Sequence, residues 1–520
     1  QYCTWTFKKA PKFFDVVTYT GTGSARTIAH SLGSTVGMML VKNTANASDA
    51  TRNWAVYHRA NTAAPQTDYL ILNTNAATAD SADWWNDTAP TSSVFTVGTD
   101  NAVNADGESY VAYIFAHETG SDSMIQCGSY IGNGNNTGPS IDLGWEPQWL
   151  LLQNITDGDS VMMFDTMRGF DNSGDDVVLL ADTNNSETND YSGQGYSTIV
   201  PTSTGFNVVK SIGYVNNNNS RMIYVAIRRP NMATITDATK VFAVAAGTSA
   251  TPSFISGFPV DFAFLQDTDN SYPRFAWDRV IGSRLELNDT DAQATGSDAF
   301  PLDHNNGTGN DGWSNVLHAY MWKRAKGYFD VVAFTSQSSG STKSFNHSLS
   351  VVPEMVWLKN RPNADQWIVY HKDTGDDVYL ALNTNGTGAA ATNWITLSNS
   401  SVSGIADNMM YNDSNYIAYL FATLAGVSKV GTVTHSGSST DVDCGFSAGA
   451  RFVLLKRTDA SGDWYVWDSV RGIIAGNDPY FVINTEAVYV TNTDFIDPLA
   501  SGFQISGDFT DGTYLFYAIA

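Results

Sequence analysis

Tyr110–Ala116 reads YVAYIFA, and two later stretches repeat it closely, YIAYLFA at Tyr416–Ala422 and YLFYAIA at Tyr514–Ala520. Each stretch is rich in residues that favour strands and is apolar at successive positions, so both faces of the strand are apolar. Such a strand lies in the centre of a sheet, or shares one face with a neighbouring unit or chain. The recurrence indicates that the chain is built from repeats.

The same order of elements runs through the chain five times. A first strand such as FDVVTYTG (Phe14–Gly21) leads to a polar turn and then to a strongly apolar strand. A short strand such as WAVYHR (Trp54–Arg59), a further strand, a variable loop and the closing strand follow. Turn residues recur every ~8–12 positions in a unit of about 100 residues, which is typical of a β-sandwich. We therefore predict an all-β fold, a tandem array of about five antiparallel sandwiches of jelly-roll or lectin-like type.

Boundaries fall where charged or small residues join a closing strand to the next first strand. Repeats 1 and 4 are the most similar pair, repeats 2 and 5 share a D-x-x-R-G motif, and repeat 3 is divergent. The joints are short, which predicts a fairly stiff rod of stacked sandwiches. The expected domains are repeat 1 (8–120), repeat 2 (121–236), repeat 3 (237–325), repeat 4 (326–425) and repeat 5 (426–520).

Residues 1–7 are expected to be the closing strand of a preceding repeat. The stretch CTWTFKKAPKFFDVVTYT (Cys3–Thr20) parallels AYMWKRAKGYFDVVAFT (Ala319–Thr335), where repeat 3 ends and repeat 4 begins. The opening of the sequence thus corresponds to the joint between two repeats.

The composition limits the partners. Asp and Glu (52) outnumber Lys and Arg (28), and the net charge of −24 argues against binding to nucleic acid or to an anionic membrane. No apolar stretch reaches the ~20 residues of a membrane helix. Cys3, Cys127 and Cys444 do not recur at a common position, which favours buried thiols made in a reducing compartment over disulfides.

Two sets of histidines are candidates for catalysis or metal binding, and comparison among the repeats argues against both. Aspartates replace them at the equivalent positions of other repeats, although a catalytic base does not usually exchange freely with Asp. A strand-end residue that satisfies local backbone groups can make this exchange, so we predict structural polar caps. The first set is His58 and His371, replaced by Asp165, Asp278 and Asp468; the second is His30 and His347, replaced by Asp142 and Asp443.

Possible glycan contacts are Trp84, Trp313, Arg168 and Arg471. Arg168 and Arg471 each follow a strand-end Asp by three residues, which favours a local ion pair over a site for a carboxylated sugar. Trp84 and Trp313 lie in predicted loops, where an aromatic ring can stack on a sugar. Trp85 and Trp394 recur at similar places in their repeats, which favours a role in closing the sandwich core.

No motif of a known catalytic site is present, so we predict that the protein is not an enzyme and binds no cofactor. The chain has no GxSxG elbow, P-loop or HExxH sequence. Three acidic loops could supply oxygen ligands to a surface Ca²⁺, although none has the spacing of a helix-flanked calcium loop. These loops are Thr156–Ser160, Asp171–Asp176 and Asp373–Asp377.

Several long strings of repeat 1 resemble a repeat domain of uncharacterised function from virion structural proteins of tailed phages, including tail fibres. The proteins are found particularly in phages of marine bacteria and cyanobacteria. Repeat 4 matches nearly as well, and repeats 2 and 5 are similar to a related repeat of the same proteins. The strings are FFDVVTYTGTGSARTIAHSLGS (Phe13–Ser34), NWAVYHR (Asn53–Arg59), WWNDTAPTSSVFTVGTD (Trp84–Asp100) and YVAYIFA (Tyr110–Ala116).

The resemblance implies a location in the virion, assembly in the cytoplasm of the bacterial host, and a fibre-like role in host-surface attachment. The expected partners are other virion proteins and a host-surface glycan or receptor, and a homotrimer is favoured. A carbohydrate-binding adhesin or a capsid decoration fibre is the alternative. A polysaccharide depolymerase tailspike is least favoured, since it needs a cleft with two carboxylates roughly 5–9 Å apart.

Overall fold

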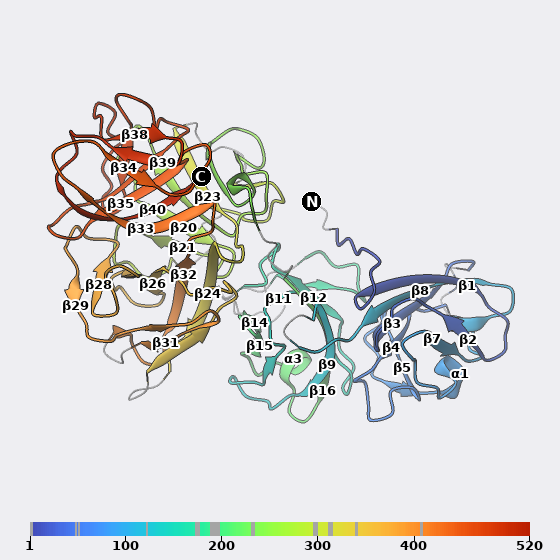
Figure 1. Cartoon of the computed structure of the whole chain (residues 1–520). Helices are drawn as coiled ribbons and strands as arrows, with labels where there is room; N and C mark the ends of the chain where they lie inside the picture. The colour runs from blue at the N-terminus through green and yellow to red at the C-terminus, as the bar shows by residue number, and fades with distance from the viewer. Residues whose placement is uncertain are drawn as a thin grey trace. The chain divides into compact units, whose positions relative to one another are not determined.

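A computed structural model describes residues 4–46, 49, 52–120, 123–171, 177–187, 198–229, 235–294, 300–309, 316–337, 342–405 and 409–520. The chain folds into two compact units, residues 1–231 (unit 1) and 232–520 (unit 2), which are described separately here. Unit 1 contains the strands β1 to β16, drawn in blue and green in Figure 1, and unit 2 contains β17 to β40. The predicted all-β fold of tandem antiparallel sandwiches is confirmed.

Repeat 1 pairs one large sheet with a small one. The large sheet has the strand order β1-β8-β3-β4-β5-β6, and β2 pairs with β7 in the second sheet. The elements are β1 (Phe14–Thr20), β2 (Arg26–Ala29), β3 (Val36–Asn43), β4 (Ala55–His58), β5 (Asp68–Ile71), β6 (Ala79–Asp80), α1 (Ala82–Trp85), β7 (Val94–Val97), α2 (Asn101–Asn104) and β8 (Ser109–Ala116).

Repeat 2 has the same plan, with the orders β13-β12-β11-β16-β9 and β10-β15-β14. Its elements are β9 (Ile125–Ile131), β10 (Ser140–Asp142), β11 (Pro147–Asn154), β12 (Met162–Asp165), β13 (Leu179–Leu180), β14 (Ile199–Thr202), β15 (Gly205–Val208), α3 (Gly213–Asn216) and β16 (Arg221–Arg228).

Repeat 3 has the orders β17-β23-β19-β20-β21 and β18-β22. Its elements are η1 (Ala238–Lys240), β17 (Phe242–Ala246), β18 (Phe254–Ile255), β19 (Phe262–Asp267), β20 (Phe275–Asp278), β21 (Arg284–Glu286), β22 (Gly307–Thr308) and β23 (Leu317–Trp322).

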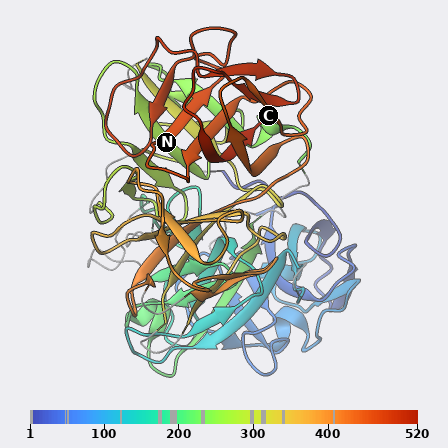
Figure 2. The same ribbon diagram turned by 60° about the vertical axis from the view of Figure 1, so that its left-hand side comes forward.

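Repeats 4 and 5 complete unit 2, which Figure 2 shows from a second direction. Their large sheets have the orders β24-β32-β26-β27-β28-β29 and β33-β40-β35-β36-β37, and their small sheets β25-β31-β30 and β34-β39-β38. Repeat 4 contains β24 (Phe329–Thr335), β25 (Lys343–Asn346), β26 (Met355–Asn360), β27 (Ile368–His371), β28 (Val378–Ala381), β29 (Ala389–Ala390), β30 (Thr396–Leu397), β31 (Ser401–Ile405) and β32 (Asn415–Phe421). Repeat 5 contains β33 (Ser428–His435), β34 (Thr440–Asp443), β35 (Phe452–Arg457), β36 (Trp464–Asp468), β37 (Tyr480–Val482), β38 (Ile496–Leu499), β39 (Gly502–Ile505) and β40 (Gly512–Ile519).

The closing strand lies between two other strands in every large sheet. In repeat 4 it is buried on both faces, as its sequence predicts, whereas in repeat 1 the second face of β8 is half-buried. In β32, Tyr416, Ala418 and Leu420 point into the core of their own sandwich. Ile417 and Tyr419 point the other way, into a second core that repeats 3, 4 and 5 build together. Alternation along a strand sends successive side chains to opposite faces, so one strand serves both cores.

This shared core of unit 2 corrects the prediction of a rod. In a linear stack repeats 3 and 5 are separated by repeat 4, whereas here all three sandwiches meet around one apolar cluster. Exposing these rings would cost on the order of 20 kcal/mol, which is an upper estimate, and this cost favours closure over a stack. The aromatic rings are Phe242, Phe262, Phe264, Tyr320 and Trp322 from repeat 3, Tyr328, Phe329, Trp357, Trp367, Tyr419 and Phe421 from repeat 4, and Phe452, Trp464, Phe481, Tyr489 and Tyr517 from repeat 5.

Two of the three cysteines lie in the described residues and are buried free thiols, as predicted. Cys127 is 0% exposed and Cys444 is 6% exposed. Burial raises the pKa of the Cys127 thiol and raises that of Cys444 to about 12, so neither is reactive at neutral pH. Cys3 lies outside the described residues. None of the helices in the described ranges is long and apolar enough to cross a bilayer.

Candidate functional site: contacts that join the sandwiches

The strand-end residue that alternates between His and Asp caps the turn that follows it. Nδ1 of His58 accepts a hydrogen bond from the backbone N–H of Ala60 at 3.2 Å. In repeat 3, Oδ1 of Asp278 accepts from the backbone N–H groups of Val280 and Ile281, both at 2.9 Å. His371, Asp165 and Asp468 make corresponding contacts. In the second set each residue accepts a backbone N–H from two positions further on, so both sets of predicted structural caps are confirmed; this set is His30, His347, Asp142 and Asp443.

The second polar atom of the same residue reaches the closing strand of another repeat. In unit 2, Asp278 of repeat 3 accepts a hydrogen bond from Oη of Tyr419 in repeat 4 at 2.6 Å. Asp468 of repeat 5 accepts one from Oη of Tyr320 in repeat 3 at 2.8 Å. The buried His371 of repeat 4 faces the backbone carbonyl of Phe516 in repeat 5, which opposes the lowering of the imidazole pKa by burial, but its Nε2 makes no hydrogen bond of normal geometry to a described residue. The contacts therefore run from repeat 3 to 4, from 4 to 5, and from 5 back to 3, which closes a ring.

Unit 1 contains two of these contacts. Nε2 of His58 in repeat 1 lies 3.0 Å from the backbone oxygen of Tyr224 in repeat 2, to which it donates. Asp165 of repeat 2 accepts a hydrogen bond from Nε1 of Trp5 at 3.1 Å. The first contact corresponds to that of His371 and the second to that of Asp468, so unit 1 is arranged like unit 2.

A second set of contacts in unit 2 runs in the opposite sense, from the start of each short strand. Nε1 of Trp367 in repeat 4 donates to the backbone oxygen of Glu286 in repeat 3 at 2.8 Å. Nε1 of Trp464 in repeat 5 donates to Ala381 O in repeat 4 at 3.0 Å. In repeat 3, Arg274 replaces the tryptophan, and its guanidinium donates to Ala487 O in repeat 5 at 2.6 Å.

Two buried lysines reinforce this second set. Nζ of Lys359 in repeat 4 donates to Thr290 O in repeat 3 at 2.8 Å, and Nζ of Lys456 in repeat 5 donates to Gly386 O in repeat 4 at 2.7 Å. Burial penalises the charged ammonium and lowers the pKa of each lysine to about 8. The backbone carbonyls around each ammonium compensate for its lost hydration, so each lysine can be buried while it hydrogen-bonds to the neighbouring sandwich.

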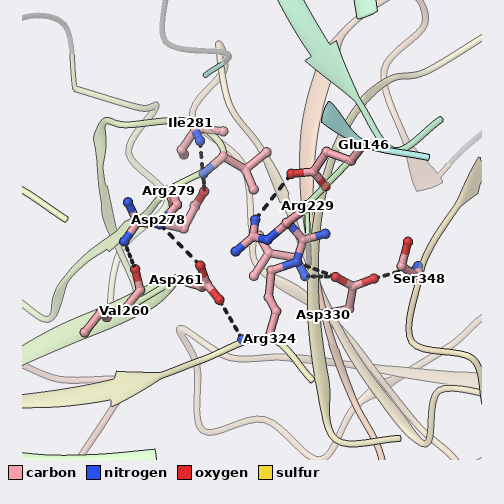
Figure 3. A network of polar contacts seen from close by, with 12 residues as sticks. Glu146, Arg229, Val260, Asp261, Asp278, Arg279, Ile281, Arg324, Asp330 and Ser348 are labelled. Atoms are coloured by element: carbon pink, nitrogen blue, oxygen red, sulfur yellow. Dashed lines mark hydrogen bonds and ion pairs between the residues drawn. The ribbon is translucent and has the colours of Figure 1, made fainter. Parts of the chain in front are cut away.

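A polar network fixes the joint between repeats 3 and 4 (Figure 3). Nε of Arg324 donates to Asp330 at 2.6 Å, and the other oxygen of Asp330 accepts from the backbone N–H of Ser348 at 2.7 Å. The backbone N–H of Arg324 donates to Asp261 at 2.7 Å, and Nε of Arg279 lies 3.3 Å from the same carboxylate. These charges are buried, and each is paired, as the cost of burying an unpaired charge requires.

Arg168 and Arg471 form the predicted local ion pairs, with Asp165 and Asp468. The guanidinium Nε lies 2.5 Å from the carboxylate in the first pair and 2.9 Å in the second. Both arginine side chains are 9% exposed. Each guanidinium also covers an aromatic ring, that of Trp5 at 5.2 Å in repeat 2 and that of Tyr320 at 5.1 Å in repeat 5. Both guanidinium groups are buried and bound to a carboxylate and an aromatic ring of this chain, so neither arginine is available to bind a carboxylated sugar.

The tryptophans that were candidates for sugar stacking do not form an exposed platform in the described residues. Trp84 is 6% exposed, and its ring stacks on Tyr69 with centroids 3.8 Å apart. Trp84 lies in α1, whose first turn is capped by Ser81. Because Tyr69 covers one face of the indole, that face is not available to stack on a sugar ring. Trp85 and Trp394 are buried in their sandwich cores, as predicted. Trp313 lies outside the described residues.

The acidic loops satisfy their carboxylates internally. Asp157 accepts hydrogen bonds from the side-chain amides of Asn217 at 2.8 Å and Asn154 at 2.9 Å. Asp373 accepts one from Thr432 at 2.6 Å. Residues 172–176 of the loop Asp171–Asp176 are not described. Over the parts of the chain that are described, no group of three or more His, Cys, Asp or Glu side chains is placed to hold a metal ion.

The sequence did not indicate a pocket of about 460 Å³ in repeat 4. Tyr379, Tyr411, Met409, Asp365, Gln366 and Asn412 contribute to its lining. Tyr411 is 53% exposed, while its backbone N–H is held by Oη of Tyr416 at 2.9 Å. Among the described lining residues Asp365 is the single carboxylate, whereas the usual hydrolysis of a glycosidic bond uses two. The described lining therefore does not supply the pair of carboxylates that a usual glycosidase needs.

A hydroxyl-to-carboxylate contact of the ring is expected to stabilise unit 2 measurably. Tyr419→Phe removes the hydroxyl from a fully buried Asp278 and is expected to lower the free energy of unfolding of unit 2 by about 2 kcal/mol. The equivalent Tyr113→Phe in repeat 1 is the matched control, with an expected change below about 0.5 kcal/mol. Urea unfolding followed by hydrogen exchange in each unit measures both. Equal losses for the two variants would contradict a specific role of the Asp278 contact.

One protein family matches most of the chain. A family model described as "Domain of unknown function (DUF7483)" matches residues 9–229 and 323–520. The first segment corresponds to repeats 1 and 2 and the second to repeats 4 and 5, while most of repeat 3 lies between them. No curated protein matches the chain.

Proposed function

Because the chain belongs to the family of the domain of unknown function DUF7483, which carries no assigned activity, we propose a function from its architecture. The protein is a non-enzymatic structural component of a phage virion, a fibre-like appendage that contributes to attachment to the host surface. The observation that carries the proposal is the use of buried polar groups. Asp278, His371, Asp468, Arg274 and Trp367 all serve contacts between sandwiches.

This use of polar groups supports a mechanical role rather than catalysis. A catalytic site gathers titratable groups around a cleft, and their pKa shifts serve a reacting substrate. Here the strand-end Asp and His residues are closed off by tyrosines and backbone groups of a neighbouring repeat. The closed ring of unit 2 also resists separation of the sandwiches, because each one is held by both of the others. An exposed appendage needs this resistance.

The argument for a homotrimer changes with the fold. The homotrimer was expected from the resemblance to phage fibres, with the second apolar face of the closing strand as added support, but in unit 2 the other repeats of the same chain cover this face. A single chain thus supplies the threefold packing that fibres of separate chains obtain by association.

Binding of a host-surface glycan at the pocket of repeat 4 is a second candidate function. The exposed ring of Tyr411 beside Asp365, Gln366 and Asn412 offers a stacking surface with polar groups at its edge. Trp84, Arg168 and Arg471 take no part in this candidate site.

Cryo-EM of purified virions that carry this chain tests the structural role. We expect the sandwiches at the particle periphery, with the ring of unit 2 recognisable in the map. Absence of the chain from the particle would overturn the proposal. Titration of the purified chain with surface polysaccharide of the host distinguishes a purely structural role from glycan binding. A glycan-binding protein is expected to bind the polysaccharide, and its Tyr411→Ala variant is expected to lose this binding.

A further inference from the structure

One face of the two large sheets in unit 1 is partly exposed, whereas the equivalent face within unit 2 is buried. Leu40, Trp54 and Tyr113 of repeat 1 are half-buried, as are Met163 and Leu179 of repeat 2. We refer to these five side chains as the open face. They lie on the side of the two large sheets that is turned away from the separate sandwich cores, as their counterparts do in unit 2.

The counterparts of the open face are fully covered in unit 2. In register they are Trp357, Trp367 and Tyr419 of repeat 4 and Val466 and Phe481 of repeat 5, and each is at most 2% exposed. Repeat 3 covers these side chains and supplies hydrogen-bond acceptors to three groups of repeat 4. Its Asp278 accepts from Tyr419, its Glu286 carbonyl from Trp367, and its Thr290 carbonyl from Lys359.

The groups that repeat 3 recognises are present in repeat 1. Tyr113 takes the place of Tyr419 and Trp54 that of Trp367; their rings lie 6.1 Å apart, compared with 6.0 Å in repeat 4. Lys42 takes the place of Lys359, and its Nζ lies 6.0 Å from the Trp54 ring centroid. Repeat 1 thus offers the same hydroxyl, indole N–H and ammonium donors at the same register positions.

Trp5 and Phe7 already occupy the positions that the closing strand of repeat 3 takes in unit 2. Trp5 donates to Asp165 and lies under Arg168, as Tyr320 donates to Asp468 and lies under Arg471. Phe7 meets Trp149 edge to face at 6.1 Å and 85°. The corresponding pair, Trp322 and Phe452, meets at 5.5 Å and 87°.

The polar joint is also half complete in unit 1. Nζ of Lys9 lies 2.6 Å from Asp15, and Asp15 accepts from the backbone N–H of Ser31 at 2.6 Å, which matches Arg324, Asp330 and Ser348. The Lys9 side chain is 58% exposed, whereas that of Arg324 is 3% exposed. In unit 2 the additional cover comes from repeat 3, whose Asp261 accepts the backbone N–H of Arg324.

We propose that the open face is the docking surface for a third β-sandwich of the repeat-3 type, which completes in unit 1 the ring seen in unit 2. Residues 4–9 form no strand in this structure, but Trp5 and Phe7 lie where a closing strand would lie, so we place this sandwich in the same chain, before repeat 1. It presents a strand-end carboxylate to Tyr113, backbone carbonyls to Trp54 and Lys42, and apolar side chains to Leu40 and Leu179. Repeat 3 of a second copy does not fit, because its carboxylate and carbonyls are engaged within unit 2.

The test compares the chain of residues 1–520 with a longer chain in which the proposed sandwich precedes residue 1, called the extended protein below. In the extended protein Tyr113→Phe is expected to lower the folding equilibrium constant of unit 1 about tenfold, since it removes a buried hydrogen bond to a carboxylate. In the 1–520 chain the same change is expected to stay within about twofold. Hydrogen exchange of β8 is expected to slow in the extended protein, and Tyr419→Phe serves as the positive control in both.

Three results would overturn the proposal, which does not depend on the proposed function. The first is an equal effect of Tyr113→Phe in the two proteins. The second is a native chain with no segment of sandwich length before Trp5. The third is self-association of the 1–520 chain that protects β8, which would identify a second copy as the occupant.

Discussion

Trp322→Ala is expected to destabilise unit 2 by about 4 kcal/mol and to loosen all three of its sandwiches together. The Trp322 ring is 1% exposed at the centre of the shared core. It contacts Phe242 at 4.8 Å, Phe262 at 5.5 Å and Phe452 at 5.5 Å between centroids, so it touches both repeat 3 and repeat 5. Removing it leaves a cavity that no single sandwich can close by a local shift.

Trp394→Ala is the matched control for this prediction. Its ring is 0% exposed, but it belongs to the separate core of repeat 4. A similar loss of about 3–5 kcal/mol is expected, with the protection from hydrogen exchange reduced mainly in repeat 4. For Trp322→Ala we expect reduced protection in β19, β32 and β40 at once. Reduction in β19 alone would show that the sandwiches do not depend on the shared core.

Acidification between pH 6.5 and 4 is expected to destabilise unit 1 through His58. Burial of the ring, which is 0% exposed, lowers the pKa of His58 to about 4, against the opposing effect of its hydrogen bond to Tyr224. The unfolded chain has a His pKa of about 6.5 and takes up a proton in this window that the folded protein does not bind. Stability therefore rises with pH in the window, and lowering the pH from 7 to 4 removes about 3 kcal/mol.

The measurement is urea unfolding of unit 1 at a series of pH values, for the parent protein and for His58→Gln. The variant is less stable at pH 7, but its dependence on pH between 6.5 and 4 is expected to be reduced by the contribution of His58. His304→Gln in repeat 3 is the control and is expected to leave the pH profile of unit 1 unchanged. A profile that His58→Gln does not alter would contradict the assignment.

The stability of unit 2 is expected to change less between pH 6.5 and 4, because its buried histidine and its buried carboxyls have opposite effects on the free energy of unfolding. Burial lowers the pKa of His371 to about 4, which costs stability as the pH falls. Burial raises the pKa of Asp478 to about 6 and also raises that of Asp278. A carboxyl whose pKa is raised by folding binds its proton more readily in the folded state, so it adds stability as the pH falls.

The closing strand shows how far local sequence goes. The two apolar faces of YIAYLFA predict a central strand with a second buried face, and β32 has both. The alternation of His and Asp at the strand end predicts a cap, because either residue accepts a backbone N–H of the following turn. The D-x-x-R-G motif predicts the local pair of Asp468 and Arg471, since three residues of a turn bring the side chains together.

The all-β class, the repeats, the interior closing strand and the caps can be predicted from the sequence, because each depends on strand periodicity or on neighbours within a few residues. Three contacts are visible only in the folded chain: Asp278 meets Tyr419, Trp84 packs on Tyr69, and repeats 3 and 5 touch. Local sequence gives a side chain the capacity to bury a ring or accept a hydrogen bond. Which partner it meets depends on how three sandwiches close around a common core, and this closure lowers the free energy by burying faces that a linear stack leaves in water.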